Sequence, residues 1–409
     1  MTQKLMAVAD ARARILADLP AMLSEQVALP DAHGRVLAAD VAARTTQPPL
    51  AVSAMDGYAV RAKDVANVPA DLKIVGEVPA GGLHEGTVGP GEAVRIFTGA
   101  AIPDGADAIV IQEDAVRGGD TVTVNEGVTA GRYVRPAGLD FQKGDVLLSA
   151  GTTLTARDIG LSAAMNHPWL RVRRKPRVAL LATGDEITLP GEELGPASIV
   201  SSNTFALAGL IRAAGGEPLT LGIAPDNKAS IRRLAEGARS ADMLVTTGGA
   251  SVGEHDLVQE ALSDIGLKID FWQIAMRPGK PLMFGRLGDM PMLGFPGNPV
   301  SSTVCGVLFL KPALARMLRT GDTEPVFETA TLGVDLGAND GQSLLWFRTC
   351  ETLGCVPGQD FAKDPLPFQS GAGDGFETID ARVVHEVDRH AENFGDANGA
   401  IGRFALDFG

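Results

Sequence analysis

The feature that most restricts the fold is a strand-then-helix pattern that repeats three times after Pro176. Short apolar strands are predicted at residues 177–182, 218–224 and 243–246, and apolar side chains at helical spacing follow each of them. Units of this length predict a parallel sheet with helices on both faces. Such a sheet binds its ligands at the carboxyl ends of its strands. The loops after these strands are therefore the first candidates for a functional site.

The rest of the chain lacks this strand-then-helix pattern. The full sequence predicts an α/β protein of several domains. Its 409 residues suffice for about three domains at roughly 150 residues each. Runs rich in Val and Ile at residues 73–75, 93–96, 108–111 and 121–124 are separated by Gly, Pro and Asp, which is typical of an antiparallel β unit. Helices are predicted at residues 5–19, 155–164 and 304–317, and the basic residues 171–175 are interpreted as a solvated connector.

Composition excludes several classes of protein. The formal net charge of -14 repels nucleic acid and anionic membranes, and 5% aromatic residues leave little for stacking on single strands. Cys305, Cys350 and Cys355 fit neither a disulfide framework nor a thiolate zinc site. The N-terminal segment is unlike a signal peptide, and the apolar run 304–310 is too short to cross a membrane. We therefore expect a soluble, cytoplasmic protein that binds neither nucleic acid nor membrane.

Polar loops follow the three predicted strands, and their residues are candidates for substrate binding. They contain Thr183, Asp185 and Glu186, then residues 225–227, then Gly248, Gly249 and Ser251 within residues 247–256. A Gly-rich loop can bring backbone N–H groups to an anion near a helix N-terminus, where the helix dipole also favours negative charge. Turn chemistry alone is the competing explanation for the glycines.

Two carboxylates in these loops predict a metal site. Asp226 and Asp256 lie one loop apart at the same sheet edge. Together they could hold Mg²⁺, which prefers one or two carboxylates combined with substrate phosphates. The alternative for each Asp is a helix N-cap. His255 is interpreted as a surface histidine because no second His lies at metal spacing.

Two later segments carry groups that suit an oxyanion. Arg277 and Lys280 lie on a stiff turn between two predicted strands, and a solvated hairpin tip is the alternative. The second segment follows a strand and opens a helix, whose N-terminus can present hydroxyl and N–H groups to an anion. Its candidate residues are Pro296, Asn298, Pro299 and Ser301. Helix initiation explains these residues equally well.

The β unit offers three further polar residues in Gly-rich surroundings. Asp56 precedes a turn-forming Gly57, and Thr98 and Asp140 add a hydroxyl and a carboxylate. Asp56-Gly57 by itself is interpreted as a turn, and composition does not join the three residues into one site.

Taken together, several segments resemble the molybdopterin molybdenumtransferase family, which includes MoeA and the E domain of gephyrin. They are residues 53–59 (SAMDGYA), 98–100 (TGA), 135–138 (RPAG), 182–186 (ATGDE), 248–254 (GGASVGE), 277–281 (RPGKP) and 296–301 (PGNPVS). Each is modest alone, but their order and spacing over about residues 1–322 make the match specific.

The resemblance implies four domains and a homodimer whose active cleft is lined by both chains. The domains are an elongated linker (1–45 and 145–175), a β-rich domain (46–144), a molybdopterin-binding α/β domain (176–322) and a C-terminal β domain (323–409). Enzymes of this family take adenylylated molybdopterin, insert molybdate at its dithiolene and release AMP with Mg²⁺. Molybdopterin adenylyltransferase and the recipient molybdoenzymes are the implied partners.

The family's functional residues carry over position by position. The implied catalytic residues are Asp56, Thr98, Asp140, Glu186, Asp226 and Asp256, and the implied molybdate contacts are Lys280 and Ser301. Two departures stand out. Gln273 replaces a Lys of many relatives, and the pattern fades after Gly341, where residues 340–409 hold 12 acidic and 5 basic side chains.

Two other functions stay open at this point. A related molybdopterin adenylyltransferase shares the sheet domain, and consumption of ATP by the pure protein would mark it. A non-catalytic pterin-binding scaffold would bind the pterin tightly and release no AMP.

Overall fold

The computed structural model describes residues 5–17, 19–248, 257–321 and 323, and short strands between residues 327 and 384. It divides into two compact units. We call Met1–Ser24 with Arg173–Gly409 the sheet unit, and Glu25–Val172 the β-rich unit.

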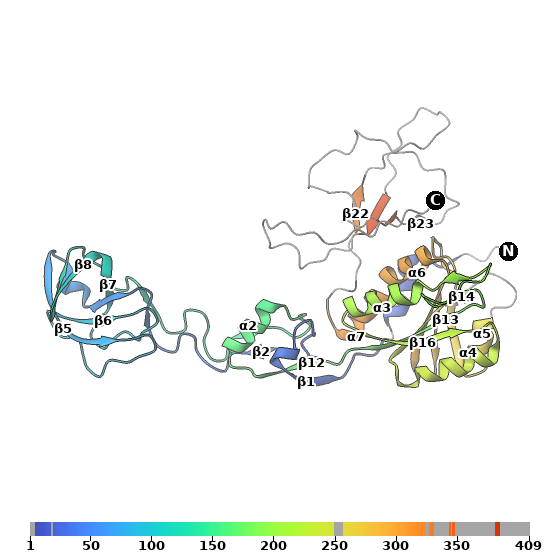
Figure 1. Ribbon diagram of the computed structural model, residues 1–409, viewed down its shortest axis with the longest axis horizontal. Coiled ribbons are helices and arrows are strands. Elements are labelled where there is room, and N and C mark those ends of the chain that lie inside the picture. The colour runs from blue at the N-terminus through green and yellow to red at the C-terminus, as the bar shows by residue number, and fades with distance from the viewer. Residues whose placement is uncertain are drawn as a thin grey trace, which may run out of the picture. The chain divides into compact units, whose positions relative to one another are not determined.

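The sheet unit is built on a six-stranded sheet of order β16-β13-β17-β21-β20-β18 (Figure 1). Its strands are β13 (Arg177–Thr183), β16 (Glu217–Ala224), β17 (Met243–Thr247), β18 (Leu267–Trp272), β20 (Met283–Leu287) and β21 (Met290–Phe295). The first four in the order are parallel, as predicted, and β18 runs in the same direction, whereas β20 lies between β21 and β18 and is antiparallel to both. This correction has a local cause, because Gly288 and Asp289 join β20 to β21 in a tight hairpin.

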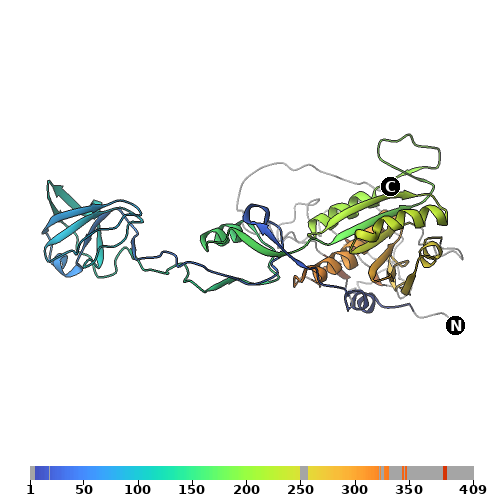
Figure 2. The same ribbon diagram turned by 90° about the horizontal axis from the view of Figure 1, so that it is seen from below.

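Helices cover both faces of this sheet, as the repeating pattern predicts (Figures 1 and 2). One face carries α1 (Val8–Ala17), α3 (Asn203–Ala213), α6 (Pro299–Cys305) and α7 (Lys311–Leu318), and the other carries α4 (Lys228–Ala235) and α5 (Leu257–Ser263). Alternate side chains of β13 supply the two cores, Val178 and Leu180 to the first and Ala179 and Leu181 to the second. The strand is apolar throughout because both of its faces are buried.

The helix after β21 is longer than the sequence pattern predicts. It begins at Pro299 rather than near residue 304, and a π-helical turn, Gly306–Leu310, joins α6 to α7. In the part of the chain that the structure describes, Pro299–Leu318 alone is long and apolar enough to cross a membrane, with a mean hydropathy of 1.2. It is 78% buried inside the protein, as a core helix is, and core helices pass the same test.

The β-rich unit contains a second six-stranded sheet, of order β7-β4-β6-β5-β9-β8. Its strands are β4 (Gly57–Val60), β5 (Ala70–Val78), β6 (Glu92–Ile96), β7 (Ala108–Ile111), β8 (Ala115–Gly118) and β9 (Thr121–Val124). All pairs are antiparallel as predicted except β5 with β6, which are parallel. The connection over residues 79–91 is long enough to return the chain in the same direction.

Shorter elements complete the β-rich unit. Three two-stranded pairs are β1 (Ser24–Ala28) with β12 (Trp169–Arg173), β2 (Val41–Ala42) with β11 (Val146–Leu148), and β3 (Val52–Ser53) with β10 (Val134–Arg135). The predicted helix is α2 (Ala156–Ala164), which begins with a capping box between Thr155 and Asp158.

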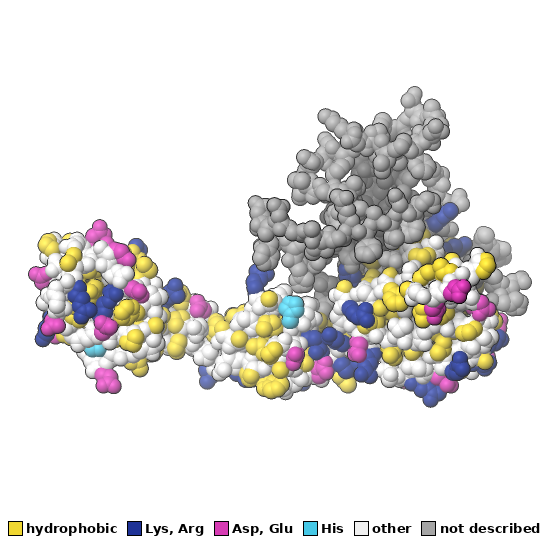
Figure 3. All heavy atoms as spheres, in the orientation of Figure 1, with side chains coloured by type: hydrophobic (Ala, Val, Ile, Leu, Met, Phe, Trp, Pro, Cys, Tyr) yellow, Lys and Arg dark blue, Asp and Glu magenta, His cyan; other side chains and the backbone are white. Residues whose placement is uncertain are grey.

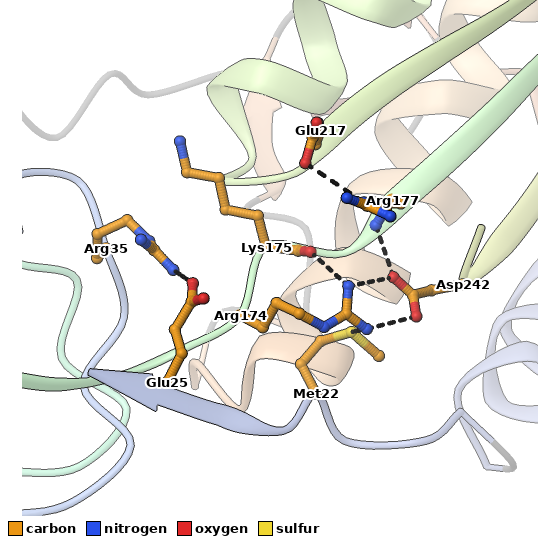
Figure 4. A network of polar contacts seen from close by, with 8 residues as sticks. All are labelled: Met22, Glu25, Arg35, Arg174, Lys175, Arg177, Glu217 and Asp242. Carbon is orange, nitrogen blue, oxygen red and sulfur yellow. Dashed lines mark hydrogen bonds and ion pairs between the residues drawn. The ribbon is translucent and has the colours of Figure 1, made fainter. Parts of the chain in front are cut away.

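The basic run 171–175 is not a solvated connector. Its first residues belong to β12, and Arg174 donates two hydrogen bonds to Asp242, at 2.9 and 2.6 Å (Figure 4). Asp242 also accepts the backbone N–H of Arg177 at 2.7 Å. The carboxylate of Asp242 therefore fixes the start of β13. The guanidinium of Arg174 is held in a bidentate ion pair with this carboxylate rather than in solvent.

Further short strands of the sheet unit pair with segments that follow α7. β19 (Met276–Arg277) pairs with β23 (Ser343–Leu344), and β22 (Phe327–Ala330), β25 (Ala381–Val384) and β24 (Trp346–Phe347) form a three-stranded sheet. Most of the predicted C-terminal domain lies outside the described residues. The division into four domains stays a prediction.

Candidate functional site

A cavity of about 310 Å³ opens at the carboxyl edge of the sheet unit. It lies at the ends of β13 and β17, neighbouring strands that are followed by helices on opposite faces, α3 and α5. Ligands of open α/β sheets bind at this kind of switch point. Thr183 and Thr247 line the cavity from the strand ends, and Gly297, Asn298 and Pro299 line it from the loop before α6.

One wall of this cavity is apolar and exposed. It comes from two short parallel strands, β14 (Ile187–Thr188) and β15 (Ile199–Val200), of which Ile187, Ile199 and Val200 face the cavity. Hydrophobic side chains gather over α3 and β14 in Figure 3, and Ile199 and Phe205 are each more than half exposed. An apolar wall beside polar loops suits a ligand that has a flat ring system and charged groups.

Gly248 is required by the close approach of two strand ends. Its φ is +88°, and a Cβ at this position would lie 2.4 Å from the carbonyl oxygen of Thr183. The Thr183 hydroxyl is buried and has no hydrogen-bond partner among the described residues, although it lines the cavity. A buried polar atom of this kind is available to a ligand. Gly249, Ser251 and Asp256 lie outside the described residues, so their roles stay predictions.

The loop before α6 is held by its own polar side chains. Asn298 caps the helix by accepting the backbone N–H of Ser301 at 3.0 Å and its hydroxyl at 3.2 Å. Ser301 is buried and is not among the residues that line the cavity, whereas Asn298 and Pro299 are exposed and line it. Pro296 is buried at the end of β21. Pro299 and Ser301 therefore lie in the first turn of a helix, and this helix starts at the cavity.

Asn203 is a residue that the sequence analysis missed. It begins α3, lines the cavity and donates from Nδ2 to the carbonyl oxygen of Gly297 at 2.7 Å. Its Oδ1 is buried and has no hydrogen-bond partner among the described residues. In a sequence, an Asn at the start of a helix indicates a helix cap and nothing more.

Acidic residues gather next to the cavity. Glu186 lines it, and Asp185 accepts the backbone N–H of Asp226 at 2.9 Å. Asp226 is exposed, and partial desolvation raises its pKa above the ordinary value. The negative charges of Asp185 and Glu186 also raise this pKa, whereas a backbone hydrogen bond from Asp185 lowers it. Asp226 is not a helix N-cap, since Asn227 caps α4 by accepting the N–H of Ser230.

Asp185 and Glu186 place two further negative charges near Asp226, and a bound cation would reduce the repulsion between these carboxylates. Within the described residues, however, no three His, Cys, Asp or Glu side chains are arranged to hold a metal ion. A metal at Asp226 therefore needs ligands from a substrate or from the loop that contains Asp256.

The cationic turn lies at the same edge of the sheet but over different strands. It connects β18 to β20, whereas the cavity lies over β13, β17 and β21. Arg277 is exposed and Lys280 is half-buried, and neither is among the described residues that line the cavity. Gly279 has a φ of +108°, and a Cβ there would lie 2.1 Å from the terminal methyl of Met276. The turn is therefore tightly packed rather than a loose hairpin tip.

In the β-rich unit, the structure joins Asp56 to Thr98. One carboxylate oxygen of Asp56 accepts the backbone N–H of Thr98 at 2.7 Å and its hydroxyl at 2.8 Å. These two bonds hold the pKa of Asp56 below its ordinary value, and the charge of Arg95 adds to them. Gly57 is more than a turn residue, since a Cβ there would lie 2.0 Å from the carbonyl oxygen of Val110 on β7.

Asp140 is exposed on a neighbouring loop of the same unit. Its backbone N–H donates to the carbonyl oxygen of Gln47 at 3.0 Å. The pairing of β3 with β10 brings this loop alongside the segment that leads to Asp56, with Arg135 opposite Val52. The structure thus gathers Asp56, Thr98 and the Asp140 loop in one unit, but only the first two are in contact.

Comparison with family models covers both units. Residues 6–166 match the MoeA N-terminal region (domain I and II), and residues 179–316 match a probable molybdopterin binding domain.

Individual relatives agree with these matches. A molybdopterin molybdenumtransferase from a Nostoc species is 40% identical over 314 residues, which cover 74% of this chain and 72% of the relative. One from Haemophilus influenzae is 36% identical, covering 75% of this chain and 76% of the relative. The crystal structure of a molybdopterin biosynthesis MoeA protein from Pyrococcus horikoshii OT3 superposes with a TM-score of 0.72 at 32% identity, covering 83% and 86% of the two chains.

Proposed function

Since this chain belongs to the molybdopterin molybdenumtransferase family, a family of enzymes in molybdenum cofactor biosynthesis, we propose that it inserts molybdate into adenylylated molybdopterin and releases AMP with Mg²⁺. The observation that carries this reaction is the cavity at the switch point of the sheet. It combines an apolar wall for a pterin, a helix start for an anion, and acidic residues at its edge.

Different residues of this chain have different roles in the proposed reaction. Asn298 and Pro299 at the start of α6, together with the buried hydroxyl of Thr183, bind and orient the substrate, because they line the cavity and the hydroxyl has no hydrogen-bond partner among the described residues. Lys280 supplies positive charge for molybdate, a tetrahedral dianion. Asp226 would hold Mg²⁺ together with substrate phosphate oxygens, and a bound Mg²⁺ neutralises charge on the phosphates when AMP leaves. Asp56, kept ionised by Thr98, offers a carboxylate at low pH as well.

Anaerobic incubation of the protein with adenylylated molybdopterin, molybdate and Mg²⁺ tests this function. We expect AMP to appear, and the product to activate a cofactor-free molybdoenzyme. If the protein instead consumes ATP with unmodified molybdopterin, it is an adenylyltransferase and the proposal is wrong. If it binds the pterin tightly but releases no AMP, it is a non-catalytic scaffold and the proposal is likewise wrong.

We also propose that the enzyme works as a homodimer whose active cleft is lined by both chains, with a molybdopterin adenylyltransferase as supplier and molybdoenzymes as recipients. Coexpression of Asp56→Ala and Asp226→Ala chains tests the shared cleft. If both chains line each cleft, a mixed dimer contains one cleft with neither substitution, and activity returns. If each cleft uses one chain, every cleft carries a substitution and no activity returns.

A further inference from the structure

Arg95 makes an unusual set of contacts in the β-rich unit. It lies half-buried on β6, opposite Tyr58 on β4. Its guanidinium carbon is 5.1 Å from the ring centre of Tyr58 and 4.8 Å from that of Phe97. One terminal nitrogen donates to the carbonyl oxygen of Gly57 at 3.2 Å, and the other donates to Oε1 of Gln112 at 2.9 Å.

Each of these contacts borders the contact between Asp56 and Thr98. Gly57 directly follows Asp56, and Phe97 directly precedes Thr98. Gln112 donates its backbone N–H to the carbonyl oxygen of Asp56 at 3.1 Å. The single side chain of Arg95 therefore touches all three chain segments that meet at Asp56.

We propose that Arg95 is a positioning residue for the enzyme, which fixes the carboxylate of Asp56 against Thr98 without itself touching the substrate. Only arginine suits these contacts. Its planar guanidinium stacks on aromatic rings while two nitrogens donate in a fixed fork, whereas lysine has a single flexible ammonium group. Displacement of a catalytic group by about 1 Å can lower a rate by about 100-fold.

The test compares Arg95→Met and Arg95→Lys with Arg117→Met as a matched control. Arg117 lies on β8 of the same unit, is half exposed and pairs with Glu77 at 3.8 Å, away from the Asp56 network. The first readout is amide hydrogen exchange at Thr98, which needs no substrate. We expect exchange to quicken by about tenfold or more in Arg95→Met, by less in Arg95→Lys, and not in Arg117→Met, because the N–H loses a fixed acceptor.

The second readout is AMP release, which rests on the proposed function. We expect kcat to fall about tenfold or more in Arg95→Met while KM changes little, because positioning acts on the reacting geometry. If the wild type releases no AMP, the proposed function fails, and exchange at Thr98 still decides the role of Arg95. Unchanged exchange at Thr98 in Arg95→Met overturns the proposal, whatever happens to kcat.

Gln112→Ala covers the case in which Arg95→Met does not fold. This variant keeps the backbone N–H to Asp56 and removes only the acceptor of Arg95. Its exchange at Thr98 should quicken less than in Arg95→Met but more than in the Arg117→Met control. Exchange equal to the control in both Gln112→Ala and Arg95→Lys overturns the proposal.

Discussion

Asp56 accepts both the backbone N–H and the side-chain hydroxyl of Thr98 through one carboxylate oxygen, although 42 residues separate them. Two hydrogen bonds to the ionised form stabilise it relative to the protonated form. The contact also restrains the side chain of Asp56 through one of its two carboxylate oxygens. An aspartate in the turn just before β4 thus acquires the fixed geometry that catalysis requires.

Thr98→Val should move the acid limb of AMP release to higher pH. The hydroxyl donor is lost and the backbone donor remains, so the pKa of Asp56 rises but stays below its ordinary value. Because Asp56 is ionised only above its pKa, a higher pKa narrows the active range from the acid side. Thr121→Val is the control, since that hydroxyl donates to Gly118 on the β8–β9 hairpin. Superimposable pH profiles of Thr98→Val and wild type would contradict this role of the hydroxyl.

Asp226→Asn should weaken the binding of Mg²⁺ and leave the fold intact. The pKa of Asp226 is raised, so its charge opposes folding above its ordinary pKa, and this penalty disappears as pH falls. The neutral amide removes the penalty, and we expect an unchanged or slightly higher Tm at neutral pH. Mg²⁺ titration of AMP release should show a higher half-saturating concentration. Asp289→Asn, on the β20–β21 turn, is a surface control. A clear fall in Tm would show that Asp226 has a structural role instead.

Gly248→Ala and Gly209→Ala should change stability in opposite directions. At Gly248 the new Cβ would lie 2.4 Å from a backbone oxygen with φ at +88°, so we expect a loss of about 1–3 kcal/mol. At Gly209, in the exposed middle of α3, nothing lies within 4 Å of the new Cβ, and alanine should stabilise by about 0.5–1 kcal/mol. Denaturant unfolding measures both. Equal effects would mean that the strand ends of β13 and β17 adjust to the methyl group.

Asp242→Ala should destabilise the sheet unit far more than Glu217→Gln does. Asp242 accepts two hydrogen bonds from Arg174 and one from the N–H of Arg177, and we expect a loss of about 1–3 kcal/mol (Figure 4). Glu217 makes only an ion pair with Arg177 at 3.7 Å, with both side chains at least half exposed, so its loss should cost about 0–1 kcal/mol. Urea unfolding distinguishes the two, and similar losses would remove the special role of Asp242.

Several elements could be predicted because their signals are local. The spacing of Leu207, Leu210 and Ile211 predicts α3, and the apolar run at residues 177–182 predicts a strand buried on both faces. Such patterns depend on which side of one helix or strand each residue faces. The antiparallel direction of β20 was missed, although a two-residue connection to β21 requires it.

In the candidate site, too, local features could be predicted and contacts between distant segments could not. Its loops were found, because loops at the carboxyl ends of parallel strands must meet at one edge. Asn203 was missed because a helix-capping Asn and a cavity-lining Asn look alike in a sequence. Arg95 was missed because its partners Tyr58, Phe97 and Gln112 meet only when β4 lies between β6 and β7.

The linear order of residues therefore set the family, the α/β class and the loops that carry chemistry, since each is written in short motifs and in periodicity. Which side chains touch was set by the order and register of the strands. Gly57 lies opposite Ile96, and this register, together with the backbone hydrogen bond from Gly99 to Ser53, places Asp56 beside Thr98. Contacts of this kind depend on packing between distant segments, and local patterns carry no information about it.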